Sequence, residues 1–285
     1  MLFQRSQRWR PWLGLVILVA FLSILVSRNV ASPPLSNEQI LSKLSRADII
    51  YLGEVHDSEA DHQAQLEIVL GLYRQNQDLA IGFEMFQRPF QPFLDRYLAG
   101  EIDEATLIKS TEYEERWGFG WEFYAPMIRF ARAHKLSLLA LNTPREITRK
   151  VSKNGIDSLS GSDFRYIPPR EDIDLGESAY RDRVKGIFEG HMGMGNADGF
   201  ERFWAAQVLW DETMADAIAE FHQTNPDTQI IVLTGRFHVQ YGEGIPSRVA
   251  RRLGTDVKQE IVLFGEEPDE SWSESLPPGD YFWQH

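Results

Sequence analysis

The sequence predicts an α/β fold in which a parallel sheet is flanked by helices and carries a smaller inserted helical cap domain. Apolar, β-branched runs alternate with amphipathic helical patterns, as expected for a parallel sheet with helices on both faces. The runs at 49–52 and 230–233 contain no charged residue, which is typical of strands buried on both faces. A long, mostly helical stretch at about 158–225 separates the third strand from the last ones and predicts the cap.

Each expected strand is a short apolar run that ends at or before a Gly, a carboxylate or an Asn. The strands are expected at 49–52, 79–84, 136–142, 229–234 and 260–264. Ser36 and Gln39 have the spacing of a capping box before the first strand, and Ser58 and Asp61 repeat that spacing after it. These pairs predict the starts of two helices.

A further helix start is expected directly after the third strand. Thr143 can cap the helix, Pro144 suits its first position, and Glu146 completes a capping box. Asn154-Gly155 should end this helix. Residues 158–176 are polar and contain two adjacent prolines, which predicts a long loop at the start of the insertion.

The two ends of the chain depart from this pattern. Residues 1–31 combine a basic head with an apolar segment at 12–26, the layout of a signal peptide or signal-anchor. The expected location is therefore extracytoplasmic, in the periplasm or on the outer face of the cytoplasmic membrane, with cleavage left open. Residues 266–285 are acidic and rich in proline, and they are expected to be irregular.

The composition limits the classes of partner and cofactor. The net charge is −13, with 42 acidic residues against 29 basic ones, which argues against nucleic acid because phosphates need clustered Lys and Arg. Hydrophobic residues make up 43% of the chain, enough to bury a full core. The absence of cysteine excludes disulfides, thiolate ligands and lipid attachment through cysteine.

Two strands end in the same short motif, Gly-x-x-His. The first is Gly53-Glu54-Val55-His56, and the second is Gly235-Arg236-Phe237-His238. Glycine allows a sharp turn, and open parallel sheets bind ligands at the carboxyl ends of their strands. We therefore expect the two imidazoles to meet at that edge, together with Glu84 and Asn142, which end two other strands.

Three roles are open for these residues. His56, Glu84 and His238 form a ligand set suited to Zn, Mn or Fe ions, with Glu54 as a catalytic residue that transfers protons. The same residues could act as general acid and base. Alternatively, each histidine could be a hydrogen-bonded structural residue at a tight turn.

Asp211 is a second candidate catalytic residue. It shares an apolar helix face, where a carboxylate is costly unless it is paired or faces a polar site. That face consists of Trp204, Val208, Asp211, Ala215 and Ile218. Gln207, one turn earlier, is a candidate ligand-binding residue, and a buried salt bridge from Asp211 to an Arg is the structural alternative. Glu212 should point away from this face and is expected to be exposed to solvent.

Other residues indicate ligand binding. Arg88 and Arg145 follow strands and could bind a carboxylate or phosphate through two parallel hydrogen bonds, or be ordinary surface residues. Asn142 could contribute at the same edge. His191 lies in a stretch rich in Met and Phe that could cover a flat apolar ligand, with His191 or a tyrosine as an axial iron ligand. The same residues could simply belong to the core.

Six separated segments carry a recognisable pattern when they are taken in order. They are Gly53-Glu54-Val55-His56-Asp57, Gly82-Phe83-Glu84-Met85-Phe86, Leu141-Asn142-Thr143-Pro144-Arg145-Glu146, Asp211-Glu212-Thr213-Met214-Ala215, Gly235-Arg236-Phe237-His238 and Gly244-Ile245-Pro246. Together they resemble the ChaN family of haem-binding uptake proteins. The resemblance implies a ChaN-like α/β domain over 35–265, haem as the cofactor, and an exported bacterial haem-binding protein linked to iron or haem uptake.

The same resemblance implies a rival function. Tiki-type proteases and erythromycin esterase belong to the wider group marked by paired Gly-x-x-His motifs, so a metal-dependent hydrolase is the alternative, with a Zn, Mn or Fe ion as cofactor. The expected partner is haem or another small molecule, and whether the chain is an enzyme is open. Membrane anchoring through residues 12–26 and assembly into a homodimer are also left open by the sequence.

Overall fold

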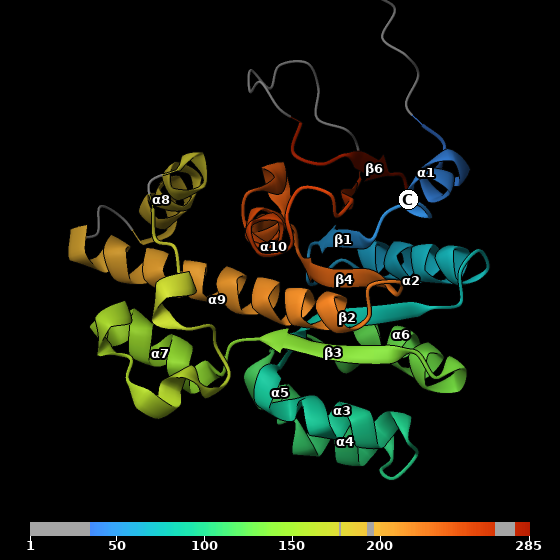
Figure 1. Ribbon diagram of the computed structural model, residues 1–285, viewed down its shortest axis with the longest axis horizontal. Helices are drawn as coiled ribbons and strands as arrows, with labels where there is room; N and C mark the ends of the chain where they lie inside the picture. The colour runs from blue at the N-terminus through green and yellow to red at the C-terminus, as the bar shows by residue number, and fades with distance from the viewer. Residues whose placement is uncertain (1–34, 177, 193–196, 266–276) are drawn as a thin grey trace, which may run out of the picture. The chain divides into compact units, whose positions relative to one another are not determined.

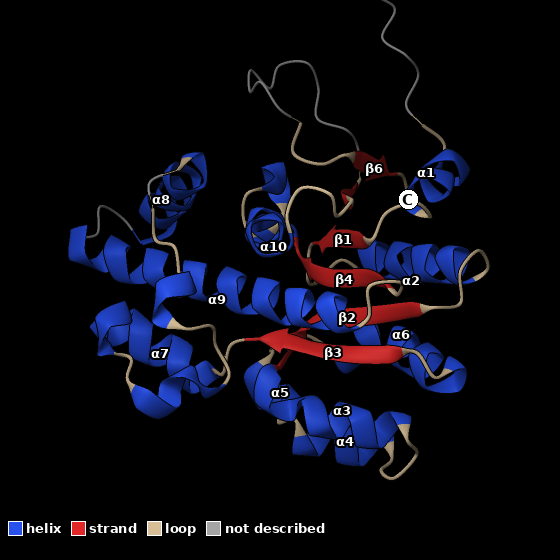
Figure 2. Ribbon diagram, in the orientation of Figure 1, coloured by secondary structure: helices blue, strands red, loops and turns tan. Residues whose placement is uncertain are grey.

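The computed structural model describes residues 35–176, 178–192, 197–265 and 277–285. Within this part of the chain, six strands form one sheet, all parallel, in the order β3-β2-β4-β1-β5-β6 (Figures 1 and 2). The strands are β1 (Ile49–Glu54), β2 (Leu79–Gln87), β3 (Ser137–Asn142), β4 (Gln229–Gly235), β5 (Gln259–Phe264) and β6 (Tyr281–Trp283). The predicted fold class, with a parallel sheet between helices, is confirmed.

Helices cover both faces of this sheet (Figure 1). They are α1 (Asn37–Leu44), α2 (Glu59–Tyr73), α3 (Gln91–Leu98), α4 (Glu104–Ser110), α5 (Tyr113–Arg116), α6 (Trp121–His134), α7 (Arg145–Asn154), α8 (Ala179–Met192), α9 (Ala197–Thr224) and α10 (Ile245–Leu253). Side chains alternate along a strand, so Ile50 and Leu52 of β1 pack with α1, α2 and α6. Ile49 and Tyr51 pack on the opposite face with α9 and α10.

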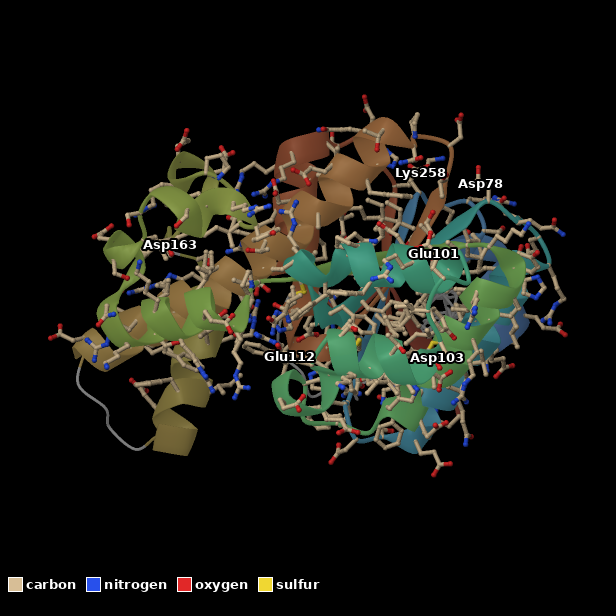
Figure 3. The ribbon with its side chains drawn as sticks, turned by 90° about the horizontal axis from the view of Figure 1, so that it is seen from below. Asp78, Glu101, Asp103, Glu112, Asp163 and Lys258 are labelled. Atoms are coloured by element: carbon tan, nitrogen blue, oxygen red, sulfur yellow. The ribbon has the colours of Figure 1, made fainter. Side chains whose placement is uncertain are left out.

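The register of the sheet places the two Gly-x-x-His motifs side by side. β1 and β4 are parallel neighbours, with Gly53 opposite Thr234 and Glu54 opposite Gly235. Both motifs therefore leave the sheet at its carboxyl edge. Asp78 and Lys258, which precede β2 and β5, mark the opposite, amino edge (Figure 3).

Close packing explains the glycine of the first motif. A Cβ atom at Gly53 would lie 2.7 Å from Leu263 Cδ2 and 2.9 Å from Val239 Cγ2. Such distances are too short for carbon atoms in contact, so β1 needs a residue without a side chain at this position. The turn that follows then carries Glu54 and His56 to the sheet edge.

Two strand predictions need correction. β2 was expected to end at Glu84, but it continues to Gln87, and its pairing with β3 is irregular between Phe83 and Gln87. Residues 266–285 were expected to be irregular, yet β6 pairs in parallel with β5. The reason is Trp283, which is buried in the apolar cluster with α1 and α2. Residues 266–276 lie outside the described part of the chain.

The inserted region consists of short 3-10 turns followed by α8 and the first half of α9. Val151 of α7, Val184 of α8 and Phe200 of α9 belong to an apolar cluster of its own. The 28-residue helix α9 then continues across the sheet, where Met214 and Ile218 pack with the strands. The insertion and the sheet therefore share one long helix.

Two of the predicted helix starts are confirmed. Ser36 and Gln39 form a capping box at α1, in which each residue bonds the backbone N–H of the other. The Ser58 side chain accepts a hydrogen bond from the Asp61 backbone N–H at the start of α2. Local spacing was sufficient in both cases because each cap depends only on residues within one helical turn.

The predicted cap of α7 is wrong. Thr143 Oγ1 donates instead to the Leu209 carbonyl oxygen of α9, at 3.2 Å, and α7 begins without a side-chain cap. Glu146 pairs with Arg116 of α5 at 2.9 Å. Tertiary partners thus replace the local capping box that the sequence indicated.

Of the helices in the described residues, none has both the length and the hydropathy needed to cross a bilayer. The expected signal peptide or signal-anchor at 1–31 and its apolar segment at 12–26 lie outside the described residues.

Candidate functional site

A cavity of about 540 Å³ lies at the carboxyl edge of the sheet. Five of the candidate residues from the sequence line it. Four of them come from the ends of four different strands and one from α7, and they are His56, Glu84, Asn142, His238 and Arg145. The structure thus brings both histidines to a common space, as parallel β1 and β4 require.

A buried carboxylate holds His56 in place. Glu54 Oε1 lies 2.9 Å from His56 Nδ1, and the same carboxylate accepts hydrogen bonds of 2.5 Å from Tyr124 Oη and Gln65 Nε2. Burial lowers the pKa of His56, but the hydrogen bond to Glu54 and nearby carboxylate charge outweigh burial and raise it. Glu54 therefore orients the imidazole, and its oxygens face protein donors.

Two polar residues of α2 that the sequence analysis missed support this arrangement. His62 Nε2 lies 3.0 Å from the His56 carbonyl oxygen, and His62 Nδ1 lies 3.1 Å from Gln65 Oε1. The signal available in the sequence was a His and a Gln three positions apart on a helix face that also carries buried Ile68 and Leu72.

His238 is held in the same way from the other face of the sheet. Its Nδ1 atom lies 2.5 Å from Asp211 Oδ1, and Tyr180 Oη donates to the other oxygen of Asp211 at 2.8 Å. Gln207 Nε2 lies 3.1 Å from the same ring nitrogen and 2.9 Å from Tyr180 Oη. Burial lowers the pKa of His238, but Glu84 and Asp211 raise it overall to about 10. Asp211 thus pairs with a histidine rather than with an arginine.

Glu84 lies between the two histidines. Thr234 Oγ1 and the Gly235 N–H both donate to its Oε2 atom at 2.7 Å, and its Oε1 atom lies 3.4 Å from His238 Nε2. Burial raises the pKa of Glu84, but the charge and hydrogen bond of His238, the charge of His56 and the Gly235 N–H together outweigh burial and lower it to about 2. Asn142 Nδ2 donates to the Glu84 carbonyl oxygen at 2.9 Å, so Asn142 fixes the backbone of β2.

The expected metal site is not formed. Among the described residues, no group of three His, Asp or Glu side chains is arranged to hold a metal ion. The physical reason lies in Glu84, since Thr234 and Gly235 occupy one of its oxygens and His238 faces the other.

Two other predicted ligand-binding residues lie elsewhere. Arg88 pairs with Asp216 and Glu220 of α9, at 2.7 and 2.5 Å, beside the edge strand β3 and away from the cavity. His191 belongs to α8, but its side chain lies outside the described part of the structure.

Aromatic and cationic side chains form the walls of the cavity. Trp117 and Phe119 each lie 4.9 Å from the His56 ring, measured between centroids, and Trp210 lies 6.2 Å from the His238 ring. Met85, Phe203 and Ala206 complete the apolar lining. The cationic lining residues are Arg116, Arg145 and Arg149.

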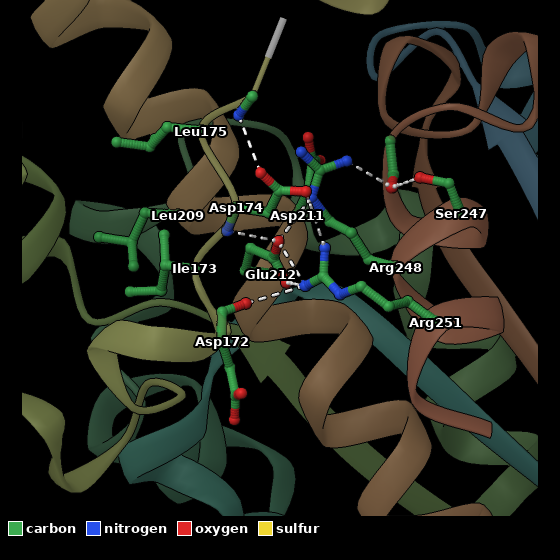
Figure 4. Close-up of polar contacts among 12 residues, drawn as sticks. Asp172, Ile173, Asp174, Leu175, Leu209, Asp211, Glu212, Ser247, Arg248 and Arg251 are labelled. Atoms are coloured by element: carbon green, nitrogen blue, oxygen red, sulfur yellow. Dashed lines mark hydrogen bonds and ion pairs between the residues drawn. The ribbon is translucent and has the colours of Figure 1, made fainter. Parts of the chain in front are cut away.

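The prediction for Glu212 is wrong. It is fully buried, lies within ion-pair distance of Arg248 and Arg251 of α10, and accepts a hydrogen bond from the Asp174 N–H at 3.1 Å (Figure 4). Arg252 of α10 also lies within ion-pair distance of it. The face of α9 that looked solvent-exposed is covered by α10 and the insertion. Glu212 thereby anchors the segment of α9 that presents Asp211.

The family of the chain follows from its similarity to known proteins. Residues 40–249 match the family described as "Haem-binding uptake, Tiki superfamily, ChaN". Protein RETICULATA-RELATED 5, a chloroplastic protein of Arabidopsis thaliana, is 26% identical over 260 residues, which are 86% of this chain and 35% of the relative. The chain therefore spans about a third of that relative's length.

One solved structure has the same fold. The ChaN of Campylobacter jejuni, solved with cofacially bound haem, is 19% identical with a TM-score of 0.66, over 87% of this chain and 91% of that one. An erythromycin esterase in its open conformation is 16% identical over 84% of this chain and 76% of that one, with a TM-score of 0.47, too distant to support an argument. Because the family match covers most of the sequence and includes both Gly-x-x-His motifs, the chain belongs to the ChaN family of haem-binding uptake proteins in the Tiki superfamily.

Proposed function

We propose that the cavity at the carboxyl edge of the sheet binds haem or a closely related tetrapyrrole. The observation that carries this proposal is the composition of one space, in which two histidines, four aromatic rings and three arginines line a volume of about 540 Å³. Flat aromatic ligands stack on such walls, and imidazole is a common axial ligand of haem iron. Membership of a haem-binding family supports the same ligand.

His56 is the residue best placed to hold the iron. Its Nδ1 atom is engaged by Glu54, so Nε2 is the ring nitrogen left for a ligand. Its ring is flanked by Trp117 and Phe119, which would exclude water from a bound tetrapyrrole. Gly235 leaves room for this ring, since a Cβ there would lie 2.8 Å from His56 Nε2. When bound, haem would supply an iron ion to which the neutral imidazole nitrogen can coordinate.

The proposal can be tested by titrating the purified chain with hemin. We expect a shifted Soret band that saturates, and an affinity at least about tenfold lower in His56→Ala, because the imidazole that would hold the iron is lost. His134→Ala is the matched control, since His134 is exposed at the end of α6, next to the amino edge of the sheet. The proposal fails if hemin gives no saturable shift, or if both variants bind as the wild type does.

Export and a role in iron or haem uptake are further parts of this proposal. They are supported by the basic head and the apolar segment of residues 1–31. The proposed location is the periplasm or the outer face of the cytoplasmic membrane. An alkaline phosphatase fusion to the full chain should be active in a bacterial host. Deletion of residues 1–31 should abolish that activity, and a fusion active without them would refute export by this segment.

A second candidate function is hydrolysis by acid–base chemistry. The observation that favours it is the pair of carboxylate–histidine dyads, Glu54–His56 and Asp211–His238, which meet at one cavity. Hydrolysis of p-nitrophenyl esters that disappears in His238→Gln and persists in His134→Ala would support this function. Equal rates in both variants would exclude it.

A further inference from the structure

One face of α7 forms a polar wall of the cavity that the proposed iron ligand does not use. Four side chains on this face of the helix line the cavity, and they follow one another at spacings of three, one and three residues. They are Arg145, Thr148, Arg149 and Ser152. The aromatic side chains Trp117 and Phe119 also line it. The cavity is therefore amphipathic, with a cationic, hydroxyl-bearing side in addition to an aromatic one.

Thr148 is the most informative member of this face. It is only 7% exposed, and its Oγ1 atom has no hydrogen-bond partner among the described residues. A threonine in a helix commonly donates to the carbonyl oxygen one turn earlier, but here the Pro144 carbonyl oxygen accepts only the Ile147 and Thr148 N–H groups. A buried hydroxyl without a partner is costly, which points to a ligand atom that accepts its proton.

Two arginines of this face, Arg145 and Arg149, form no ion pair with a carboxylate of the described residues, although the charge of Arg149 helps to lower the pKa of Glu146. Arg116 is neutralised by Glu112 and Glu146, at 2.8 and 2.9 Å. Arg145 instead donates to the Glu115 carbonyl oxygen at 2.5 Å and has no carboxylate partner in the described part of the chain. Arg149 forms neither an ion pair nor a side-chain hydrogen bond with any described residue. Two guanidinium groups are thus available to an anionic ligand.

We infer that this face of α7 is a carboxylate-binding subsite, which takes a propionate arm of the tetrapyrrole while the ring lies against the aromatic wall. Arg149 and Arg145 supply charge-assisted hydrogen bonds, and Thr148 Oγ1 donates the buried one. The inference rests on the proposed function, because the carboxylate is that of the bound tetrapyrrole. It adds a prediction about ligand specificity. The cavity should bind a porphyrin with free carboxylates more tightly than the same porphyrin with esterified ones.

The test compares hemin with hemin dimethyl ester, which keeps the iron and the ring but lacks the carboxylates. Binding is followed by quenching of tryptophan fluorescence, since Trp117 and Trp210 line the cavity. The full chain should bind hemin at least about tenfold more tightly than the ester. Thr148→Val and Arg149→Gln should each reduce that preference severalfold while leaving the affinity for the ester unchanged.

Lys153→Gln provides the matched control, since it removes one positive charge from an exposed position of the same helix outside the cavity lining. It should keep the wild-type preference. Equal binding of hemin and ester by the wild type would overturn the subsite and leave haem binding intact. A preference that Lys153→Gln reduces as much as Arg149→Gln would also overturn it, because general charge attraction would then suffice. Failure of both porphyrins to bind would overturn the proposed function and the subsite together.

Discussion

Asp211 and Glu212 are consecutive residues of α9 whose buried carboxylates hold two different elements. Asp211 Oδ1 lies 2.5 Å from His238 Nδ1 at the cavity. Glu212 Oε2 instead lies 2.7 Å from Arg251 of α10 (Figure 4), and it also lies 2.8 Å from Arg252. Buried carboxylates are tolerated when their oxygens are paired in this way. The position of His238 is thereby tied to the packing of α9 against α10.

Replacing Asp211 with Asn should lower the pKa of His238. Asp211 is one of the two carboxylates that raise this pKa to about 10 against the opposing effect of burial. Loss of one negative charge at hydrogen-bond distance should lower it by at least about one pH unit. The measurement is the pH dependence of the His238 ring resonances in NMR spectra of the wild type and the variant.

Asp163→Asn is the control for that titration. Asp163 pairs with Lys150 in the insertion and has no contact with His238, so its loss should leave the histidine resonances unchanged. If Asp211→Asn also left the titration unchanged, the Asp211–His238 dyad would not exist in solution.

Replacing Glu212 with Gln should destabilise the fold. Three arginines of α10 surround this carboxylate in a fully buried position. Removing its charge leaves Arg248 without a carboxylate partner among the described residues, and it leaves Arg251 and Arg252 only the weaker contacts to Asp174 and Asp216, both at 3.6 Å. The expected loss in the free energy of unfolding is about 3 kcal/mol, measured by urea denaturation. Glu220→Gln removes an exposed partner of Arg88 and should cost less than about 1 kcal/mol. Similar losses in both variants would refute the anchoring role of Glu212.

The sheet and the meeting of the two histidines could be predicted because they depend on local patterns. Uninterrupted apolar runs identify β1 and β4, and in a parallel sheet both must end at the same edge. The repeated Gly-x-x-His motif then carries His56 and His238 to that edge without any knowledge of the remaining chain.

The partners of the buried carboxylates could not be predicted, since they come from distant elements. Helical periodicity placed Glu212 on the outer side of α9, but α10 covers that side with arginines. Glu84 resembled a metal ligand, yet Thr234 and Gly235 of β4 occupy one of its oxygens. The short strand β6 depends on Trp283, whose burial a three-residue pattern cannot reveal.

The ion pair of Glu84 and His238 should make stability depend on pH in both directions. The pKa of Glu84 is lowered from 4.5 to about 2, so its contribution is complete above 4.5 and is lost as the pH falls toward 2. The pKa of His238 is raised from 6.5 to about 10, so its contribution is complete below 6.5 and is lost as the pH rises toward 10. The pair should therefore stabilise most between pH 4.5 and 6.5.

Urea denaturation of the wild type and of a Glu84→Gln/His238→Gln double variant measures this dependence. The free energy of unfolding should vary less with pH in the double variant, because neither side chain then titrates. Identical pH profiles for the two proteins would show that the pair contributes nothing to the pH dependence.

Replacing Gly235 with Ala should displace His56 and weaken hemin binding. The new Cβ atom would lie 2.8 Å from His56 Nε2 and 2.9 Å from His56 Cε1, closer than such atoms approach, so the ring must move. Because Glu54 holds the other ring nitrogen, that movement also disturbs the 2.9 Å contact between them. Hemin titration should show an affinity lower by about tenfold or more.

Gly186→Ala in α8, where a Cβ meets no atom within 4 Å, should leave hemin affinity unchanged. Unchanged affinity in Gly235→Ala would mean that hemin does not depend on the position of His56.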